Sequence, residues 1–181
     1  MQDSRKHIAL IGFMGAGKTC VARELATRYG RGRVDLDEAI ETKVGKSVTD
    51  IFVQDGERCF RELELEALDD ALSQPKTTII SCGGGTVTNP TSLALLKSKA
   101  VVVYLGVSPE RALTRIDNWT TRPLLTLAGN VDAVYALAQS RLALYEAAAD
   151  VSVGTDKLDI SEVTDAVVLK LKEASYAELL A

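Results

Sequence analysis

The chain has 181 residues, of which 46% are hydrophobic and 25% are charged, and its formal net charge is −4. This length fits one domain over residues 1–181, and this balance excludes a disordered chain. The net negative charge does not favour binding to nucleic acid. No apolar run approaches the roughly 18 residues of a membrane-spanning helix. We therefore expect a cytoplasmic monomer without a nucleic-acid or membrane partner. Three cysteines and one histidine predict neither a disulfide framework nor a zinc site.

Short apolar runs alternate with longer segments of helical spacing. In chain order, we expect strand 7–11, helix 18–29, strand 34–36, a short helix after Ser47, helix 56–72, strand 77–82, helix 90–97, strand 100–105, a helix after Ser108, an irregular loop at 120–129, helix 130–148, strand 150–153 and helix 161–173. The strands are unbroken apolar runs, as is typical of parallel strands buried on both faces. The pattern predicts an α/β three-layer sandwich.

The segment between the first strand and the first helix carries a nucleotide-binding motif. Gly12-Phe13-Met14-Gly15-Ala16-Gly17-Lys18-Thr19 fits the pattern G-x-x-x-x-G-K-S/T at every fixed position. The glycines let backbone amides converge on phosphates, Lys18 reaches the β- and γ-phosphates, and the Thr19 hydroxyl binds Mg²⁺. The alternative is a glycine-rich turn of a different fold. The strand before the motif and the helix after it favour a nucleoside-triphosphate site.

Two carboxylates are candidates for the metal-binding partner of this loop, although they do not follow the strands where that partner usually lies. No Asn-Lys-x-Asp guanine-recognition motif is present, and strands 77–82 and 100–105 do not end in aspartate. Asp35 and Asp37 lie at the end of the short second strand, where residues two apart face the same side. One can hold a Mg²⁺-bound water while the other faces an acceptor hydroxyl. The alternative is a solvated strand end, or an N-cap of the helix after Glu38.

Several arginines and a glycine triplet are candidates for the acceptor side. Arg61 lies three residues after Arg58 on one helix, and its alternative interpretation is a solvated surface charge. Gly83-Gly84-Gly85 closes a buried strand, where a ligand close to the backbone would explain glycine, and a loose turn is the alternative. Arg141 lies in an otherwise apolar helix segment, an unfavourable place for an unpaired charge.

In this order and approximate spacing, the motifs resemble those of shikimate kinase. The matching segments are Gly12–Thr19, Asp35-Leu36-Asp37, Gly56-Glu57-Arg58-Cys59-Phe60-Arg61, Gly83-Gly84-Gly85, Arg122-Pro123-Leu124-Leu125, and Arg141 with Leu144-Tyr145. The resemblance spans about residues 7–170. It implies a five-stranded parallel sheet of the P-loop, nucleoside-monophosphate-kinase type. It also implies phosphoryl transfer from ATP, with Mg²⁺, to the 3-hydroxyl group of shikimate.

The resemblance also assigns roles to residues. It implies ATP contacts at Gly12, Gly15, Ala16, Gly17, Lys18, Thr19, Cys20, Arg115 and Arg122. It implies shikimate contacts at Asp37, Arg61, Gly83, Gly84, Gly85 and Arg141, with the two arginines on the carboxylate. Lys18, Asp37 and Arg122 would be catalytic, and Thr19 and Asp35, the latter through water, would hold Mg²⁺. Residues 118–129 would form a lid, and residues 34–61 would be part of the acceptor-binding region.

The chain departs from the family pattern at Ala143, where a proline is usual before the Leu-Tyr pair. We expect Cys20 and Cys82 to be packed small residues without a catalytic role. Two alternatives remain open at this point. One is a kinase for another small hydroxy acid or a nucleoside monophosphate, and the other is a nucleotide-dependent switch protein.

Overall fold

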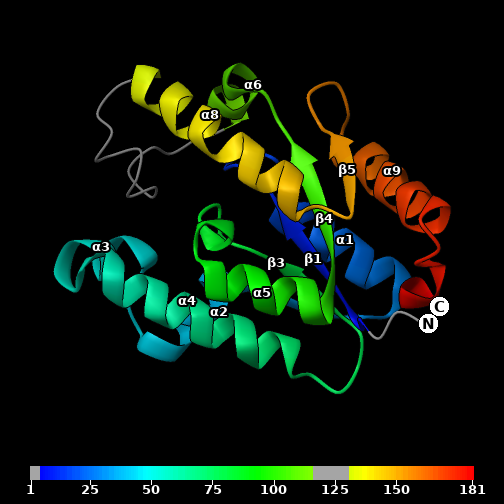
Figure 1. Ribbon diagram of the computed structural model, residues 1–181, viewed down its shortest axis with the longest axis horizontal. Coiled ribbons are helices and arrows are strands. Elements are labelled where there is room, and N and C mark those ends of the chain that lie inside the picture. Colours follow the sequence, from blue (N-terminus) through cyan, green and yellow to red (C-terminus); the bar gives the residue numbers. More distant parts are fainter. Residues whose placement is uncertain (1–4, 116–130) are drawn as a thin grey trace.

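Figure 1 shows a computed structural model of the chain, in which residues 5–115 and 131–181 are described. Its parallel strands form one five-stranded sheet in the order β2-β3-β1-β4-β5. The strands are β1 (His7–Ile11), β2 (Gly32–Asp35), β3 (Thr78–Ser81), β4 (Ala100–Gly106) and β5 (Val151–Gly154). This order places β1 at the centre, so the loop after β1 opens at the middle of the carboxyl edge of the sheet.

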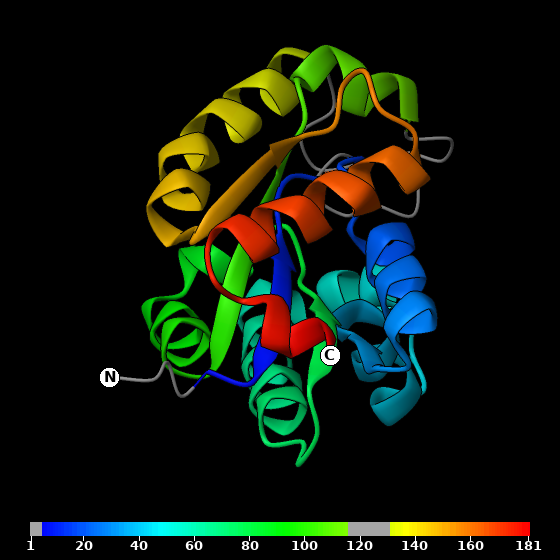
Figure 2. The same ribbon diagram turned by 90° about the vertical axis from the view of Figure 1, so that its right-hand side faces the viewer.

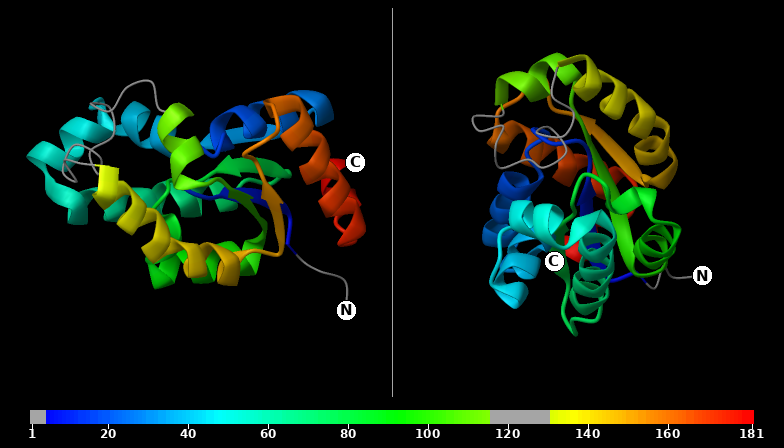
Figure 3. Two further views of the ribbon diagram at one scale, coloured as in Figure 1. Left: turned by 90° about the horizontal axis from the view of Figure 1, so that it is seen from above. Right: turned by 90° about the vertical axis from the view of Figure 1, so that its left-hand side faces the viewer.

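Helices cover both faces of this sheet, which confirms the predicted three-layer sandwich. They are α1 (Lys18–Tyr29), α2 (Leu36–Val44), α3 (Val48–Gln54), α4 (Gly56–Leu72), α5 (Pro90–Lys99), α6 (Pro109–Arg115), α8 (Val131–Ala148) and α9 (Ile160–Glu173), with 3₁₀ helices η1 (Thr86–Thr88) and η3 (Ala177–Leu180). Figure 2 shows α1 and α9 on the face turned to the viewer. The left panel of Figure 3 shows α5 and α8 on the opposite side of the strands.

Two buried clusters hold the layers together, one on each face of the sheet. Within β1, Ala9 and Ile11 belong to the cluster under α2, α4 and α5, whereas Ile8 and Leu10 belong to the cluster under α1 and α9. Successive residues of a strand point to opposite faces, so a strand that is covered on both sides must be apolar throughout. All five residues of β1 are buried. Four of them, residues 8–11, are apolar as the pattern predicts, and His7 is a buried polar residue at the start of the strand.

The second strand ends earlier than predicted, and this changes the placement of two candidate residues. β2 ends at Asp35, and Leu36 is already the first residue of α2. The Asp35 carboxylate accepts hydrogen bonds from the backbone N–H groups of Asp37 (3.1 Å) and Glu38 (3.4 Å). Asp35 is therefore an N-cap. The prediction that Asp35 and Asp37 share one face of a strand is wrong, because Asp37 lies in the first turn of a helix.

The last residues of the chain and Arg5, the first residue that the structure describes, also contact the folded layers. The last residues form η3, whose Leu179 and Leu180 are buried in the cluster under α1 and α9. Arg5 Nη2 donates a 2.6 Å hydrogen bond to the Tyr176 hydroxyl, which joins the segment before β1 to the segment before η3.

Over the part of the chain that the structure describes, no helix combines the length and the apolar character that a membrane crossing requires.

Candidate active site

The loop between β1 and α1 has a backbone that requires glycine. Gly12, Gly15 and Gly17 have φ angles of 144°, 77° and 91°, a region that residues with side chains rarely adopt. A Cβ atom on Gly12 would also overlap the carbonyl oxygen of Leu105 at the end of β4. No described side chain caps α1, which begins at Lys18. The loop therefore presents backbone amides and a helix N-terminus, the groups that bind phosphate in this motif.

Two cations contact the carbonyl groups of this loop. Lys18 Nζ donates hydrogen bonds to the oxygens of Gly12 (2.9 Å) and Phe13 (3.1 Å), so its side chain lies back across the loop. Arg115, in the last turn of α6, donates to Gly15 O (3.3 Å) and Thr155 O (2.6 Å). Arg115 therefore joins the loop to the segment after β5.

A set of oxygen atoms lies at the first turn of α1. Thr19 Oγ1 donates a 2.7 Å hydrogen bond to Asp35 Oδ2 and lies 3.4 Å from Ser81 Oγ. Hydroxyl and carboxylate oxygens are ligands that suit Mg²⁺, which usually keeps several waters and takes other ligands from phosphates. In residues 5–115 and 131–181, no group of three or more histidine, cysteine or acidic side chains is placed to hold a metal alone. These oxygen atoms therefore suit a Mg²⁺ ion that takes its other ligands from the phosphates of a nucleotide.

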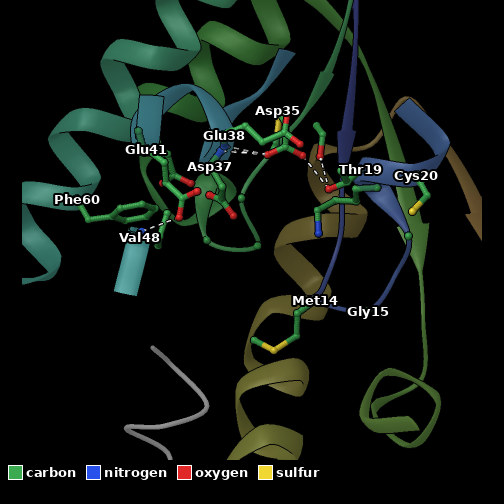
Figure 4. A pocket seen from close by; sticks show the side chains of 18 of the residues that line it. Met14, Gly15, Thr19, Cys20, Asp35, Asp37, Glu38, Glu41, Val48 and Phe60 are labelled. Carbon is green, nitrogen blue, oxygen red and sulfur yellow. Dashed lines mark hydrogen bonds between the residues drawn. The ribbon is translucent and has the colours of Figure 1, made fainter. Parts of the chain in front are cut away.

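These groups open into a cavity of about 590 Å³ between the loop and helices α2, α3 and α4. Figure 4 shows Met14, Gly15, Thr19 and Cys20 on one side, Glu41, Val48 and Phe60 on the other, and Asp35 and Asp37 between them. Of the predicted residues, those that line the cavity are Gly15, Gly17, Lys18, Thr19, Cys20, Asp35, Asp37, Arg61, Gly83, Gly84, Gly85, Arg115 and Arg141. The structure thus gathers both predicted halves of the site around one space.

Arg61, which the sequence predicts for the acceptor side, is not a solvated surface charge. Its side chain is 16% exposed, and it forms ion pairs with Glu64 (2.7 Å) and Glu57 (3.1 Å). Burial opposes the guanidinium charge, but the two carboxylates outweigh burial and raise the pKa of Arg61. Arg58, on the same helix, is 93% exposed and pairs with Glu62 instead. The two arginines therefore do not face the same way.

Glu64 is a site residue that sequence reasoning missed. It is 1% exposed, and its second carboxylate oxygen accepts a 2.6 Å hydrogen bond from Thr86 Oγ1. It lies four residues after Phe60 and four before Leu68, within the buried face of α4. A charge inside an apolar helical stripe was the available signal, because such a charge requires a partner.

The glycine triplet is tightly packed, so the loose-turn alternative is wrong. A Cβ atom on Gly83 would overlap Glu64 Oε1, and one on Gly85 would overlap the guanidinium of Arg61. At Gly84 the nearest atom to such a Cβ is Arg141 Nη1, at 3.7 Å. The glycines are explained first by the protein's own side chains, which pass close to the backbone at two of the three positions.

Arg141 is buried, and its guanidinium is hydrogen-bonded to a backbone carbonyl group. It is 7% exposed, and its Nη1 donates a 3.1 Å hydrogen bond to the carbonyl oxygen of Gly84. Tyr145, one helical turn further along α8, donates a 2.5 Å hydrogen bond to the same oxygen. The arginine is therefore held against the glycine triplet, at the wall of the cavity.

The remaining predicted residues are buried, exposed or outside the described part of the chain. Gly12 and Ala16 are buried beneath the loop and do not line the cavity. Cys82 is buried as expected, and burial raises the pKa of its thiol, but Cys20 is exposed, so the expectation that it is packed is wrong. Arg122 and the predicted lid at 118–129 lie outside the described residues. Lining residues that were not predicted include Glu38, Glu41, Val48, Phe52, Ser81 and Ile160.

The sheet order and the loop at the carboxyl end of its central strand define a P-loop phosphotransferase fold of the nucleoside-monophosphate-kinase type. The family model described as shikimate kinase matches residues 14–172, and the chain belongs to the shikimate kinase family. The resemblance seen in the sequence is thereby confirmed.

Individual relatives agree with this assignment. A shikimate kinase of Dehalococcoides mccartyi (strain 195) is 41% identical over 93% of this chain and 95% of its own length. One of Xanthomonas axonopodis pv. citri is 42% identical over 91% of each chain. A solved structure of shikimate kinase from Acinetobacter baumannii in complex with shikimate is 32% identical, covers 94% of this chain and 96% of its own, and superposes with a TM-score of 0.88.

Proposed function

We propose that this protein transfers the γ-phosphoryl group of ATP to the 3-hydroxyl group of shikimate. The observation that carries the proposal is the placement of Lys18 and Thr19 of the phosphate-binding loop and Asp37, Arg61 and Arg141 around one cavity. Membership in the shikimate kinase family and the likeness to a structure solved with shikimate support the same acceptor over a nucleoside monophosphate or another hydroxy acid. Such a reaction needs mainly positioning and electrostatic stabilisation from the protein.

The nucleotide half uses the loop, with contacts at Gly15, Gly17, Lys18, Thr19 and Cys20, which line the cavity. Contacts of ATP with Gly12 and Ala16 stay predictions from the sequence. Lys18 exchanges its two carbonyl partners for the β- and γ-phosphates. Thr19 would hold Mg²⁺, with Asp35 acting through water, and the metal would offset negative charge on the phosphates. Arg115 lies on the adenine side. Arg122 stays a prediction from the sequence, as a lid residue that stabilises the transferring phosphate.

The acceptor half uses Asp37, Arg61, Arg141 and the glycine triplet. Asp37 orients the attacked hydroxyl and accepts its proton, a role that suits a carboxylate facing the cavity. Arg61 and Arg141 bind the shikimate carboxylate, because two planar guanidinium groups match a planar anion. Backbone groups of Gly83, Gly84 and Gly85 contact the ring hydroxyls.

A coupled ADP-release assay tests the proposal with shikimate, gluconate and a nucleoside monophosphate side by side. We expect turnover with shikimate alone. Lys18→Ala is the matched negative control, because it removes the cation from the phosphates. Comparable turnover with gluconate or the nucleotide, or full activity of Lys18→Ala, would overturn the proposal.

A further inference from the structure

The carbonyl oxygen of Gly84 is a shared acceptor for two side chains of α8. Arg141 Nη1 donates to it at 3.1 Å, and the Tyr145 hydroxyl donates at 2.5 Å. A carbonyl oxygen has two lone pairs, so the two bonds together use its full capacity. The peptide group of Gly84, in the wall of the candidate active site, is thus held to α8 by two hydrogen bonds.

The Tyr145 hydroxyl is held rigidly and remains a donor. The side chain is 1% exposed, and its ring stacks on that of Tyr104 with centroids 5.3 Å apart and planes inclined by 15°. Tyr145 also lines a second cavity, together with Phe13 and Leu142. Burial, partly offset by the nearby Arg141 charge, raises the pKa of Tyr145 to about 12. The phenol therefore stays protonated throughout the neutral range.

The orientation of this peptide matters for the acceptor. A trans peptide is planar, so the N–H of Gly85 points opposite to the carbonyl of Gly84, away from α8. Three successive glycines have weak backbone preferences of their own, and contacts from outside the segment must fix their orientation. The bond to Gly84 also engages one nitrogen of Arg141, which sets the plane of its guanidinium against the cavity wall.

We propose that Tyr145 is a positioning residue for the acceptor: its hydroxyl fixes the Gly84 peptide and, through it, both the Arg141 guanidinium and the backbone amide of Gly85. This inference rests on the proposed function, in which Arg141 and the triplet bind shikimate. Tyr145 itself is not among the residues that line the candidate active site, so it acts through its neighbours and not on the reacting atoms.

Steady-state kinetics of Tyr145→Phe tests this role, because the substitution removes one oxygen and keeps the stacked ring. We expect the KM for shikimate to rise about two- to tenfold, the range that one neutral hydrogen bond gives, while the KM for ATP and kcat change less than twofold. The change in KM is expected to be the same from pH 6.5 to pH 8.5, since Tyr145 does not titrate there. Tyr104→Phe is the matched control, with the same substitution in the stacked ring, and its KM is expected to stay at the wild-type value.

An unchanged KM for shikimate in Tyr145→Phe, with a lower melting temperature, would show a purely structural hydroxyl and overturn the inference. Equal increases in Tyr104→Phe and Tyr145→Phe would also overturn it, because the ring stack would then be the cause. Stabilisation of each variant against heat by shikimate alone gives a second measurement that does not need turnover. Wild-type protein that fails to phosphorylate shikimate would overturn the proposed function and this inference together, whereas active wild type with an unaffected Tyr145→Phe would overturn the inference only.

Discussion

Thr19 Oγ1 lies 2.7 Å from Asp35 Oδ2, while Oδ1 of the same carboxylate accepts the backbone N–H of Asp37. One side chain therefore joins the phosphate-binding loop to the start of the helix that carries Asp37. Asp35 is 8% exposed, so its position is fixed by these bonds. The two aspartates are two residues apart but have different surroundings, and substitution can test the separate roles that we propose for them.

Exchanging each aspartate for asparagine is expected to give different kinetic signatures. Asp37→Asn removes the proposed base for the acceptor hydroxyl and is expected to lower kcat by about 10²- to 10⁴-fold, with little change in the KM for ATP. Asp35→Asn keeps an N-cap side chain, since asparagine caps helices well, so its melting temperature stays near that of wild type. It is expected to need more Mg²⁺ for half-maximal turnover. Weakened MgATP binding with normal kcat in Asp37→Asn would mean that the two roles are exchanged.

The arginine pair is expected to govern shikimate affinity. Truncating one partner of a partly buried charged pair costs about 2–5 kcal/mol, or roughly 30-fold to several-thousand-fold in affinity. Arg61→Ala and Arg141→Ala are expected to lose shikimate affinity on this scale and to keep ATP affinity within a few-fold. Arg141→Lys is also expected to weaken binding, because lysine keeps the charge but not the planar fork.

The same helix provides the control for this prediction. Arg58 is 93% exposed, and Arg58→Ala is expected to leave both affinities unchanged. Arg61→Ala is also expected to lower the melting temperature more than Arg141→Ala does, because it leaves the buried Glu64 without its cation. Normal shikimate binding by either Arg61→Ala or Arg141→Ala, measured by calorimetry, would contradict the two-arginine assignment.

Local patterns in the sequence predicted most elements of the fold but not the contacts between distant segments. The bounds of α4 follow from apolar residues such as Phe60 and Leu68 at helical spacing. The end of β2 was misplaced because Asp35 can either continue a strand or cap a helix, and only the hydrogen bonds decide. Glu64 pairs with Arg61 on the same helix and with Thr86, 22 residues away, and the spacing of apolar residues does not indicate the second pairing. Side-chain contacts at this separation are set by packing.

His7, at the start of β1, is expected to make stability depend on pH. It is 2% exposed, and its Nδ1 accepts a 3.3 Å hydrogen bond from the backbone N–H of Thr78, which requires the neutral ring. Burial lowers the pKa of His7 below 6.5, and the positive charges of Lys6 and Lys99 lower it further. A hydrogen bond with the backbone of Leu72 opposes this shift but does not cancel it. The unfolded chain then binds the proton more readily, so the free energy of unfolding falls as the pH drops below about 6.5.

Denaturant unfolding at pH 7.5, 6.5 and 5.5 measures this effect. The contribution of His7 is at most about 1.4 kcal/mol per pH unit, and it is fully present above the pKa of the unfolded chain. In His7→Asn, which does not titrate in this range, the fall in stability between pH 6.5 and pH 5.5 is expected to be smaller. Equal falls in the wild type and in His7→Asn would rule out His7 as the source.

Gly85→Ala tests whether the position of Arg61 in this structure is the one that binds the acceptor. Gly85 has a φ angle of −103°, which alanine adopts freely, so backbone strain does not enter. The added methyl group would overlap the guanidinium of Arg61, and the flexible arginine must move aside. We expect the KM for shikimate to rise toward that of Arg61→Ala, with an unchanged KM for ATP. The melting temperature is expected to lie between those of wild type and Arg61→Ala, because the displaced guanidinium weakens its ion pair with Glu64.

Two further variants make this last test selective. Gly154→Ala adds the same methyl group where no atom lies within 4 Å, and its kinetics are expected to match those of wild type. In the double variant Gly85→Ala/Arg61→Ala, the methyl group has no guanidinium left to displace. Since contacting residues are not additive, the KM for shikimate of the double variant is expected to equal that of Arg61→Ala alone. A further increase in the double variant would show that the added methyl group itself obstructs the acceptor, independently of Arg61.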